Sequence, residues 1–365
     1  MLLKKLRCSH FKNHSATELS FSDCLNIIVG PNGAGKTTIL DGIHYLALAS
    51  SAFSALDLNN IQYGQNFFVI EGCFVKEERD HVIRYYYAKQ ARKSLQHNNQ
   101  PYQRIRDHVG RFPVVLTTPY DIDLIRGGGE LRRRFLDTIL CQQDNTYLYT
   151  LTRYQRLLKQ RNQLLRDYKV SGKVDQALLH TYDQQLIPLN QQLALSRFAC
   201  VKEFLPHFEK YYHYFSGRNE KVSLGYESSA LSPDFASIFR SHYQQDLALQ
   251  RTTQGVHKDD VHFLLNSYPI RHAGSQGQQK SFFIALRLAQ FSYLEHKLRY
   301  KPILLLDDIF ENLDEQRVSR LVKLISKKNF GQLFITDAGH QRATIFNLEE
   351  FSDRRVIRME QGVPS

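Results

Sequence analysis

The strongest chemical signal in the sequence is the glycine-rich run Gly30-Pro31-Asn32-Gly33-Ala34-Gly35-Lys36-Thr37. It matches the phosphate-binding loop, and it lies between an apolar run at residues 25–29 and a helix predicted from Lys36 to about Leu48. Glycines allow backbone N–H groups to turn toward phosphates, and the start of the helix adds the positive end of its dipole. We expect Lys36 to reach the β- and γ-phosphates and Thr37 to ligate Mg²⁺. The predicted nucleotide-binding residues are Gly30, Pro31, Asn32, Gly33, Ala34, Gly35, Lys36, Thr37 and Thr38.

A second candidate is a pair of acids, Asp307 and Asp308, which directly follows the apolar run at residues 303–306. Sheets that carry a phosphate-binding loop place the acid on the Mg²⁺ side at such a strand end. We predict that Asp307 holds Mg²⁺ through water. Asp308 is the predicted general base, because a carboxylate there can polarise the attacking water. Lys36 is the second predicted catalytic residue. The alternative is a solvated strand end, which is common, but the intact loop favours the catalytic interpretation.

The run Ser275-Gln276-Gly277-Gln278 opens an amphipathic helix predicted for residues 276–296. Ser275 and Gln278 have the spacing of a capping box, in which each side chain hydrogen-bonds the other residue's backbone. A helix start with small residues is also a phosphate site. The nucleotide bound by this chain already has the glycine loop for its phosphates. The phosphate at this second site would therefore have to come from a nucleotide on a partner molecule.

The elements that position these residues fall into three blocks. Strand patterns near both ends flank a helical middle with two amphipathic series at residues 151–165 and 179–193, which predicts an antiparallel hairpin that Pro188 kinks or splits. Alternating apolar and polar residues at 67–100 predict antiparallel strands with a turn at Asn98-Asn99. We predict an α/β protein with a helical lobe inserted at residues 126–250 between two head segments, 1–125 and 251–365.

Composition points to a cytoplasmic protein that attracts polyanions. The chain has a net charge of +12, five scattered cysteines and no apolar stretch long enough for a signal peptide or a membrane span. Residues 126–169 contain ten Arg or Lys and four acidic residues, a net charge of +6. Such a cluster binds phosphates along DNA with little sequence specificity, although a solvated face with local ion pairs is an equal alternative for any one arginine. The predicted DNA-contacting residues are Arg132, Arg133, Arg134, Arg153, Arg156, Lys159 and Arg161.

Taken together, the motifs resemble the ABC ATPases. The glycine loop corresponds to Walker A, and Ser275–Gln278 corresponds to the signature. The strand that ends in Asp307 corresponds to Walker B, and the run 311–314 corresponds to the D-loop. The resemblance implies that two heads sandwich two ATP molecules. Residues Ser275, Gln276, Gly277 and Gln278 would then bind ATP across the interface, and Asn312 and Asp314 would line the dimer seam.

A closer resemblance, to the RecF family of bacterial DNA replication and repair proteins, extends over essentially the whole chain. The motifs that carry it are Phe11-Lys12-Asn13-His14, Arg126-Gly127-Gly128-Gly129, residues 132–137, residues 154–162, Gly255-Val256-His257-Lys258-Asp259-Asp260 and residues 274–278. Val256, Lys258 and the run 117–121 depart from the family pattern. The resemblance implies ATP-controlled binding at single-strand gaps and duplex DNA, a weak DNA-stimulated ATPase that serves as a switch, and cooperation with RecR, RecO and the recombinase RecA.

Two other classes of protein share these motifs. The ATP-binding subunit of a membrane transporter would carry a switch histidine after the strand that ends at Thr336, whereas this chain has Asp337 there and His340 further on. SMC- or Rad50-like structural ATPases have coiled-coil arms hundreds of residues long. The basic helical insert argues against the first class, and the shortness of the helical hairpin argues against the second.

Overall fold

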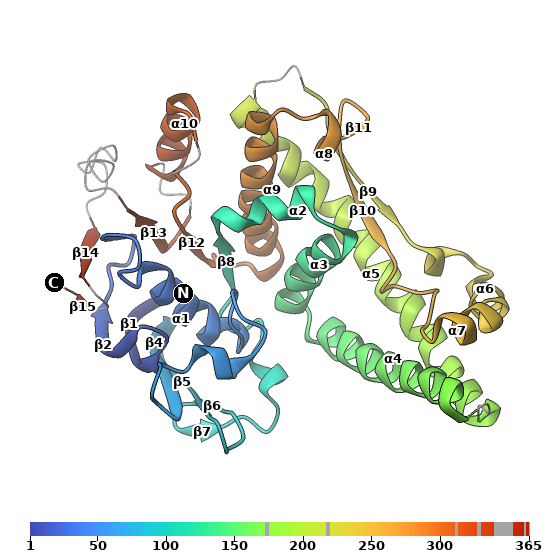
Figure 1. Ribbon diagram of the computed structural model, residues 1–365. Coiled ribbons are helices and arrows are strands. Elements are labelled where there is room, and N and C mark those ends of the chain that lie inside the picture. Colours follow the sequence, from blue (N-terminus) through green and yellow to red (C-terminus); the bar gives the residue numbers. More distant parts are fainter. Residues whose placement is uncertain are drawn as a thin grey trace. The chain divides into compact units, whose positions relative to one another are not determined.

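A computed structural model covers residues 1–365, of which it describes 1–171, 175–216, 220–310, 313–326, 330–338, 353–360 and 363–364. The chain forms two compact units. Unit 1 comprises Met1–Asp121, Tyr211–Gly217 and Lys280–Ser365, and unit 2 comprises Ile122–Lys210 and Arg218–Gln279. Unit 1 is built on two sheets and unit 2 is mainly helical (Figure 1).

One sheet of unit 1 contains the phosphate-loop strand, with the strand order β15-β14-β3-β13-β12-β8. Its strands are β3 (Leu25–Val29), β8 (Val114–Thr117), β12 (Ile303–Leu306), β13 (Leu333–Asp337), β14 (Arg354–Glu360) and β15 (Val363–Pro364). All neighbouring pairs are parallel except β14 with β15. Strands β3, β12 and β13 are buried on both faces, which explains their continuous apolar sequences. Their carboxyl ends lie at one edge of the sheet, where α/β folds bind ligands.

The other sheet of unit 1 is antiparallel, with the order β2-β1-β4-β5-β6-β7. Its strands are β1 (Leu2–Phe11), β2 (His14–Ser20), β4 (Phe67–Lys76), β5 (Arg79–Ala88), β6 (Ser94–His97) and β7 (Gln100–Pro101). The predicted turn is confirmed, because Asn98 and Asn99 join β6 to β7 with positive φ angles of 50° and 63°.

A hydrophobic core links both sheets through helix α1 (Lys36–Leu48). Leu6 of β1, Ile28 of β3 and Ile39 of α1 all belong to it and are at most 1% exposed. The helix that carries the phosphate loop is therefore held from two sides. The remaining elements of unit 1 are the short helices η1 (Asp57–Asn60) and η2 (Ile105–His108) and helix α10 (Glu315–Ser326); η3 (Pro119–Ile122) leads into unit 2.

Unit 2 contains most of the helices and a three-stranded antiparallel sheet of order β11-β10-β9. Its strands are β9 (Val222–Glu227), β10 (Asp260–Leu265) and β11 (Tyr268–Pro269). Its helices are α2 (Asp123–Arg126), α3 (Gly129–Gln143), α4 (Asn145–Ser171), α6 (Phe235–Ser241), α7 (Tyr243–Leu249), α8 (Ile270–Ala273) and η4 (Ser229–Leu231). Helices α5 (Gln176–Ser216) and α9 (Gln276–Leu298) contribute residues to both units.

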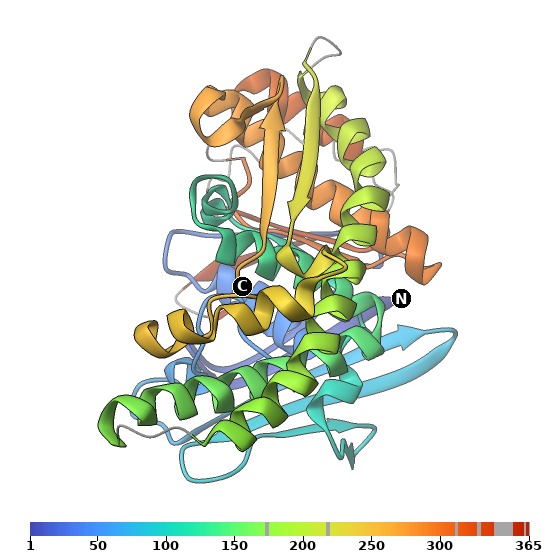
Figure 2. The ribbon, with the colours of Figure 1, turned by 90° about the vertical axis from the view of Figure 1, so that its right-hand side faces the viewer.

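The predicted helical hairpin is present as α4 and the first part of α5, which lie close together in both views (Figures 1 and 2). Arg153 of α4 donates a hydrogen bond of 3.1 Å to the Gln185 side chain of α5. Pro188 was expected to kink or split the second helix; the split is wrong, because α5 continues through both Pro188 and Pro206, and the kink stays a prediction. Leu186, on the same helix, is fully buried, and tertiary packing of this kind can compensate for the one backbone hydrogen bond that a proline removes.

The compact units divide at different places from the predicted domain limits of 125/126 and 250/251. Residues 251–279 pack within unit 2, because β10 pairs with β9 and Asp260 binds Arg132 of α3. The Ser275 motif therefore lies in unit 2, whereas the phosphate loop lies in unit 1. Over the described part of the chain, no helix has both the length and the apolar character that crossing a membrane requires.

Candidate functional site

The glycine loop joins β3 to α1 in the arrangement that its sequence predicts. Gly33 and Gly35 have φ angles of 83° and 96°, a region that side chains other than glycine rarely adopt. Gly35 is the N-cap of α1, and no side chain from the described residues caps this helix start. The Lys36 ammonium folds back over the loop and donates to the carbonyl oxygens of Gly30 and Pro31 at 2.9 and 3.1 Å.

The oxygens expected to bind Mg²⁺ meet beside the loop. The Thr37 hydroxyl lies 3.0 Å from each carboxylate oxygen of Asp307. Mg²⁺ keeps several of its waters when it binds a protein, so an ion on the Thr37 hydroxyl would have Asp307 close enough to bind one of those waters. Thr336 of β13 donates to Asp307 at 2.7 Å and holds the carboxylate in place. Burial raises the pKa of Asp307, and the positive charge of a bound cation would favour its ionised form.

Asp308 follows Asp307 in an unusual backbone conformation, with a φ angle of 42°. Its N–H donates to the Thr336 hydroxyl at 2.9 Å. Thr336 therefore organises both acids, although sequence analysis missed it. The only signal was its position at the end of an apolar strand next to β12 and β3. Positive φ angles at non-glycine residues concentrate at functional sites, where surrounding contacts maintain the strain.

In unit 2, the Ser275 motif forms the predicted capping box. The Ser275 N–H donates to the Gln278 side chain at 2.7 Å, and the Gln278 N–H donates to the Ser275 hydroxyl at 3.2 Å. Gln278 also donates to Glu220 at 2.7 Å. Gln276 and Gly277 form the first turn of α9, and Gln276 is exposed. The capping box is thus confirmed, and the phosphate-binding role of this helix start stays a prediction.

Of the two residues predicted to line the dimer seam, the structure describes Asp314 but not Asn312. Asp314 caps α10, accepting from the Arg317 N–H at 2.9 Å and pairing with its guanidinium. That backbone hydrogen bond and the arginine lower the pKa of the exposed Asp314 carboxylate. Asn312 lies outside the described residues, as does His340, whereas Asp337 is the buried last residue of β13.

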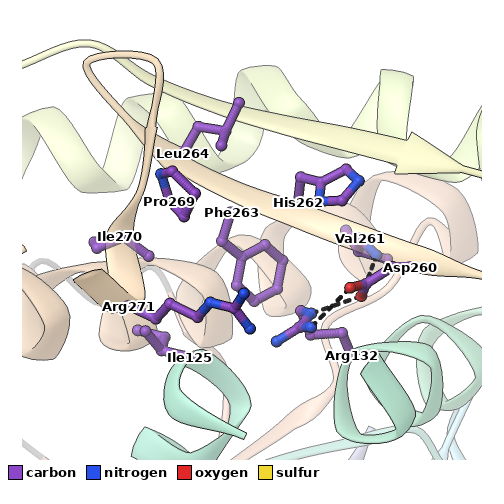
Figure 3. Close-up of a pocket in the computed structure, with 10 residues that line it drawn as sticks. All are labelled: Ile125, Arg132, Asp260, Val261, His262, Phe263, Leu264, Pro269, Ile270 and Arg271. Carbon is purple, nitrogen blue, oxygen red and sulfur yellow. Dashed lines mark hydrogen bonds and ion pairs between the residues drawn. The ribbon is translucent and has the colours of Figure 1, made fainter. Parts of the chain in front are cut away.

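Two of the predicted DNA-contacting arginines are corrected by their burial in unit 2. Arg132 is 5% exposed, binds Asp260 through two hydrogen bonds of 2.9 Å and donates to the Gly127 carbonyl at 2.8 Å. It lines a pocket of about 100 Å³ together with Phe263 and Arg271, and Phe263 is drawn between the two arginines (Figure 3). Burial raises the pKa of Asp260, but hydrogen bonds from Arg132 and a backbone N–H outweigh it and lower that pKa overall. A side chain so engaged cannot also reach a DNA backbone.

Arg161 is the second correction, since it is 1% exposed and lies inside unit 2. It donates to Asp183 and Asp246 at 2.7 Å each, and to Thr252 at 2.8 Å. Arg161 lies on the buried face of α4. The count of charges along the sequence did not distinguish this face from the exposed face. Arg161 therefore ties α4 to α5 and α7.

The other predicted arginines and the lysine are more accessible. Arg133 donates to the Asp259 carbonyl at 2.6 Å, and Arg134 pairs with Glu130 on the surface. Arg153, Arg156 and Lys159 are exposed on α4 at three-residue spacing. These last three are the strongest remaining candidates for contact with phosphates.

The motif Gly255–Asp260 proves to organise unit 2. The Asp259 carboxylate accepts from buried Arg197 at 3.1 Å, and His257 hydrogen-bonds the Tyr154 hydroxyl at 2.6 Å. Burial lowers the pKa of His257 to about 4, so the neutral ring accepts from Tyr154 and donates to the Thr252 carbonyl. These contacts explain the motif as a structural one, which the sequence alone did not reveal.

Comparisons with known proteins agree with this architecture. The model of a family described as "AAA domain" matches residues 5–203. The chain is 42% identical to the DNA replication and repair protein RecF of Cytophaga hutchinsonii over 99% of this chain and 96% of that one. It is 37% identical to RecF of Bacteroides thetaiotaomicron over 100% and 98% of the two chains.

Solved structures share the fold. A structure described as "the recombination mediator protein RecF-ATPrS in RecFOR pathway" has a TM-score of 0.89 at 24% identity, covering 100% of this chain and 97% of that one. An SMC head domain from Pyrococcus furiosus has a TM-score of 0.58 at 17% identity, covering 100% and 95%. The fold is that of an ABC-type ATPase head with an inserted, mainly helical lobe. From its identity to curated relatives over nearly their whole length, the chain belongs to the RecF family of DNA replication and repair proteins.

Proposed function

We propose that this protein binds DNA under the control of ATP, as a dimer with two ATP molecules at its interface. The observation that carries the proposal is the meeting of the Thr37 hydroxyl with the Asp307 carboxylate beside a glycine loop crossed by Lys36. The loop and Lys36 would hold the phosphates, and Thr37 and Asp307 would hold Mg²⁺, which neutralises charge on the phosphates. Asp308 would then polarise the attacking water as a general base.

The partner's contribution is the start of α9. Ser275 and Gln278 make this helix start rigid through their reciprocal hydrogen bonds, and Gln276 in its first turn is exposed. Its N–H groups can bind the γ-phosphate of an ATP held by the other protomer. In this proposal, hydrolysis removes the group that joins the protomers, so slow turnover acts as a switch that releases DNA.

The proposal is tested with two variants in the full-length protein. Lys36→Met removes the cation over the phosphates, and Ser275→Arg places a bulky charge at the helix start. We expect both to lose ATP-dependent dimers in analytical ultracentrifugation and at least tenfold in ATP-dependent DNA affinity. Ser275→Arg should still bind ATP as a monomer, whereas Lys36→Met should not. A Ser275→Arg protein that dimerises and binds DNA with ATP as the wild type does would contradict the shared site.

We further propose that the exposed face of α4 contacts the DNA backbone through Arg153, Arg156 and Lys159. These side chains are exposed and repeat every three residues, so they follow one side of the helix. The slope of log affinity against log salt changes by about 0.9 for each phosphate that the protein no longer neutralises. Replacing all three with Gln should therefore make the slope shallower by about two to three.

A matched control separates direct binding from overall charge. Lys202, Lys221 and Arg240 are exposed basic residues elsewhere in unit 2, and replacing them with Gln removes the same net charge. We expect this control to change the slope by less than about one unit, since a distant charge is screened by salt. Equal slopes for the two triple variants would place the DNA-binding surface elsewhere.

Membership of the RecF family supports a proposal about partners. A solved relative is described as a recombination mediator in the RecFOR pathway. We propose that this chain likewise acts with RecR and RecO at single-strand gaps and helps to load RecA. Co-sedimentation of the ATP-bound protein with RecR on gapped DNA would support this role, and the absence of any complex would oppose it.

A further inference from the structure

Three consecutive residues at the turn between β1 and β2 contact the glycine loop or the helix α1 that follows it. Lys12 pairs with Asp41 of α1 at 2.6 Å. Asn13 donates to the Gly33 carbonyl at 3.2 Å and accepts from the Thr38 hydroxyl at 2.8 Å. His14 hydrogen-bonds the Gly35 carbonyl at 3.1 Å. We call Lys12, Asn13 and His14 the loop strap.

His14 is the most constrained member of the loop strap, since it is fully buried. A carbonyl can only accept, so Nε2 of His14 carries a proton and donates to Gly35. Nδ1 then accepts from the Thr17 hydroxyl at 2.9 Å. The Gly35 carbonyl therefore fixes the tautomer, and the Thr17 hydroxyl supplies the donor that this tautomer needs at Nδ1.

The packing between the loop strap and the loop leaves no spare space. A Cβ atom at position 35 would lie 2.6 Å from Nε2 of His14 and 2.8 Å from Nδ2 of Asn13. Gly35 is therefore required by its positive φ angle and also by the closeness of the loop strap.

This contact bears on nucleotide binding through peptide geometry. In a planar trans peptide the C=O and the following N–H point in opposite directions. The Gly35 carbonyl accepts from Nε2 of His14 and also from the Ile39 N–H at 3.2 Å, which is the first helical hydrogen bond of α1. Both hydrogen bonds hold this carbonyl, so the Lys36 N–H of the same peptide points to the opposite, inward side of the proposed phosphate site. Phosphate-binding loops use these inward N–H groups.

We propose that His14 and Asn13 are positioning residues that preset the glycine loop for phosphate binding, so that their loss weakens ATP affinity without unfolding the protein. The inference rests on the proposed ATP-binding function. The loop strap acts through the loop backbone, and a preset loop loses less conformational freedom when phosphate binds.

The test compares two amide replacements of His14 that place a hydrogen-bonding group near different nitrogen positions of the imidazole. His14→Gln keeps a donor close to the Nε2 position, whereas His14→Asn keeps an amide near Nδ1 and withdraws from Gly35. Affinity for a fluorescent ATP analogue and the melting temperature without nucleotide are measured for each full-length variant. We expect an affinity loss on the order of tenfold for His14→Asn and about twofold for His14→Gln, since one hydrogen bond contributes about a factor of ten.

Asn13→Ala provides a second route, because Asn13 is exposed and its loss does not threaten the fold. It should weaken ATP binding several-fold with an unchanged melting temperature. Affinities equal to the wild type in His14→Asn and Asn13→Ala would overturn the proposal, as would equal losses in His14→Gln and His14→Asn. A wild-type protein that binds no ATP would overturn the proposed function and the inference with it, so the two failures are distinct.

Discussion

An Asp308→Asn variant is expected to hydrolyse ATP about 100- to 10,000-fold more slowly than the wild type, because it loses the carboxylate proposed as the general base. Asn retains the size of the side chain and tolerates a positive φ angle as well as Asp does, so the backbone at φ 42° need not change. The N–H of residue 308 can still donate to Thr336. The Thr37–Asp307 pair is untouched, so ATP binding should persist.

Two measurements separate loss of chemistry from loss of structure. Single-turnover hydrolysis reports the chemical step, and sedimentation with ATP reports the dimer, which we expect to live longer because hydrolysis no longer ends it. Glu315→Gln is the control: it removes one exposed carboxylate from the first turn of α10 and should change the rate by less than twofold. Hydrolysis by Asp308→Asn within threefold of the wild-type rate would remove Asp308 from the catalytic role.

The parts of this site that sequence could predict are those whose function depends on a local run. The glycine loop needs its residue types in consecutive positions, and the capping box needs Ser275 and Gln278 three residues apart, so both could be recognised without coordinates. Asp307 and Asp308 could be recognised because an apolar strand precedes them. In each case the local sequence determines the local geometry.

The contacts that sequence missed act across long separations, even where the residue belongs to a recognised motif, as His14 does. Thr336 reaches Asp307 from a neighbouring strand, and His14 reaches Gly35 from another sheet. Neither has a local pattern that reveals the contact. The same limit explains the two misassigned arginines: a charge count over residues 126–169 records Arg161 as available, whereas its helical phase turns it into the interior. Burial decides whether an arginine can bind a DNA phosphate or instead pairs with an aspartate inside the protein. It depends on residues far away in the sequence, such as Asp246.

Asp246→Ala is expected to destabilise the protein by about 3–5 kcal/mol, since it leaves a buried guanidinium with one partner removed. Asp246 is 1% exposed and accepts from Arg161 at 2.7 Å. It also accepts from the N–H and hydroxyl of Thr253 at 2.8 and 2.6 Å. Asp183, the other carboxylate on Arg161, retains its bond of 2.7 Å. Urea unfolding followed by circular dichroism measures the loss.

The controls for this prediction decide what Arg161 does. Asp234→Ala removes an exposed carboxylate from unit 2 and should change stability by less than about 0.5 kcal/mol. Replacing Arg161, Asp183 and Asp246 together with Met, Leu and Leu removes every buried charge of the cluster, and it should recover most of the stability because no ion is left unpaired. The salt dependence of DNA binding by the triple variant is measured as well. An unchanged slope would mean that Arg161 stabilises the lobe and contacts no phosphate, whereas a slope shallower by about one in a stable triple variant would mean that Arg161 does contact DNA.

The stability measurement has its own contradicting result. If Asp246→Ala is as stable as the wild type, the cluster does not hold α4 to α7.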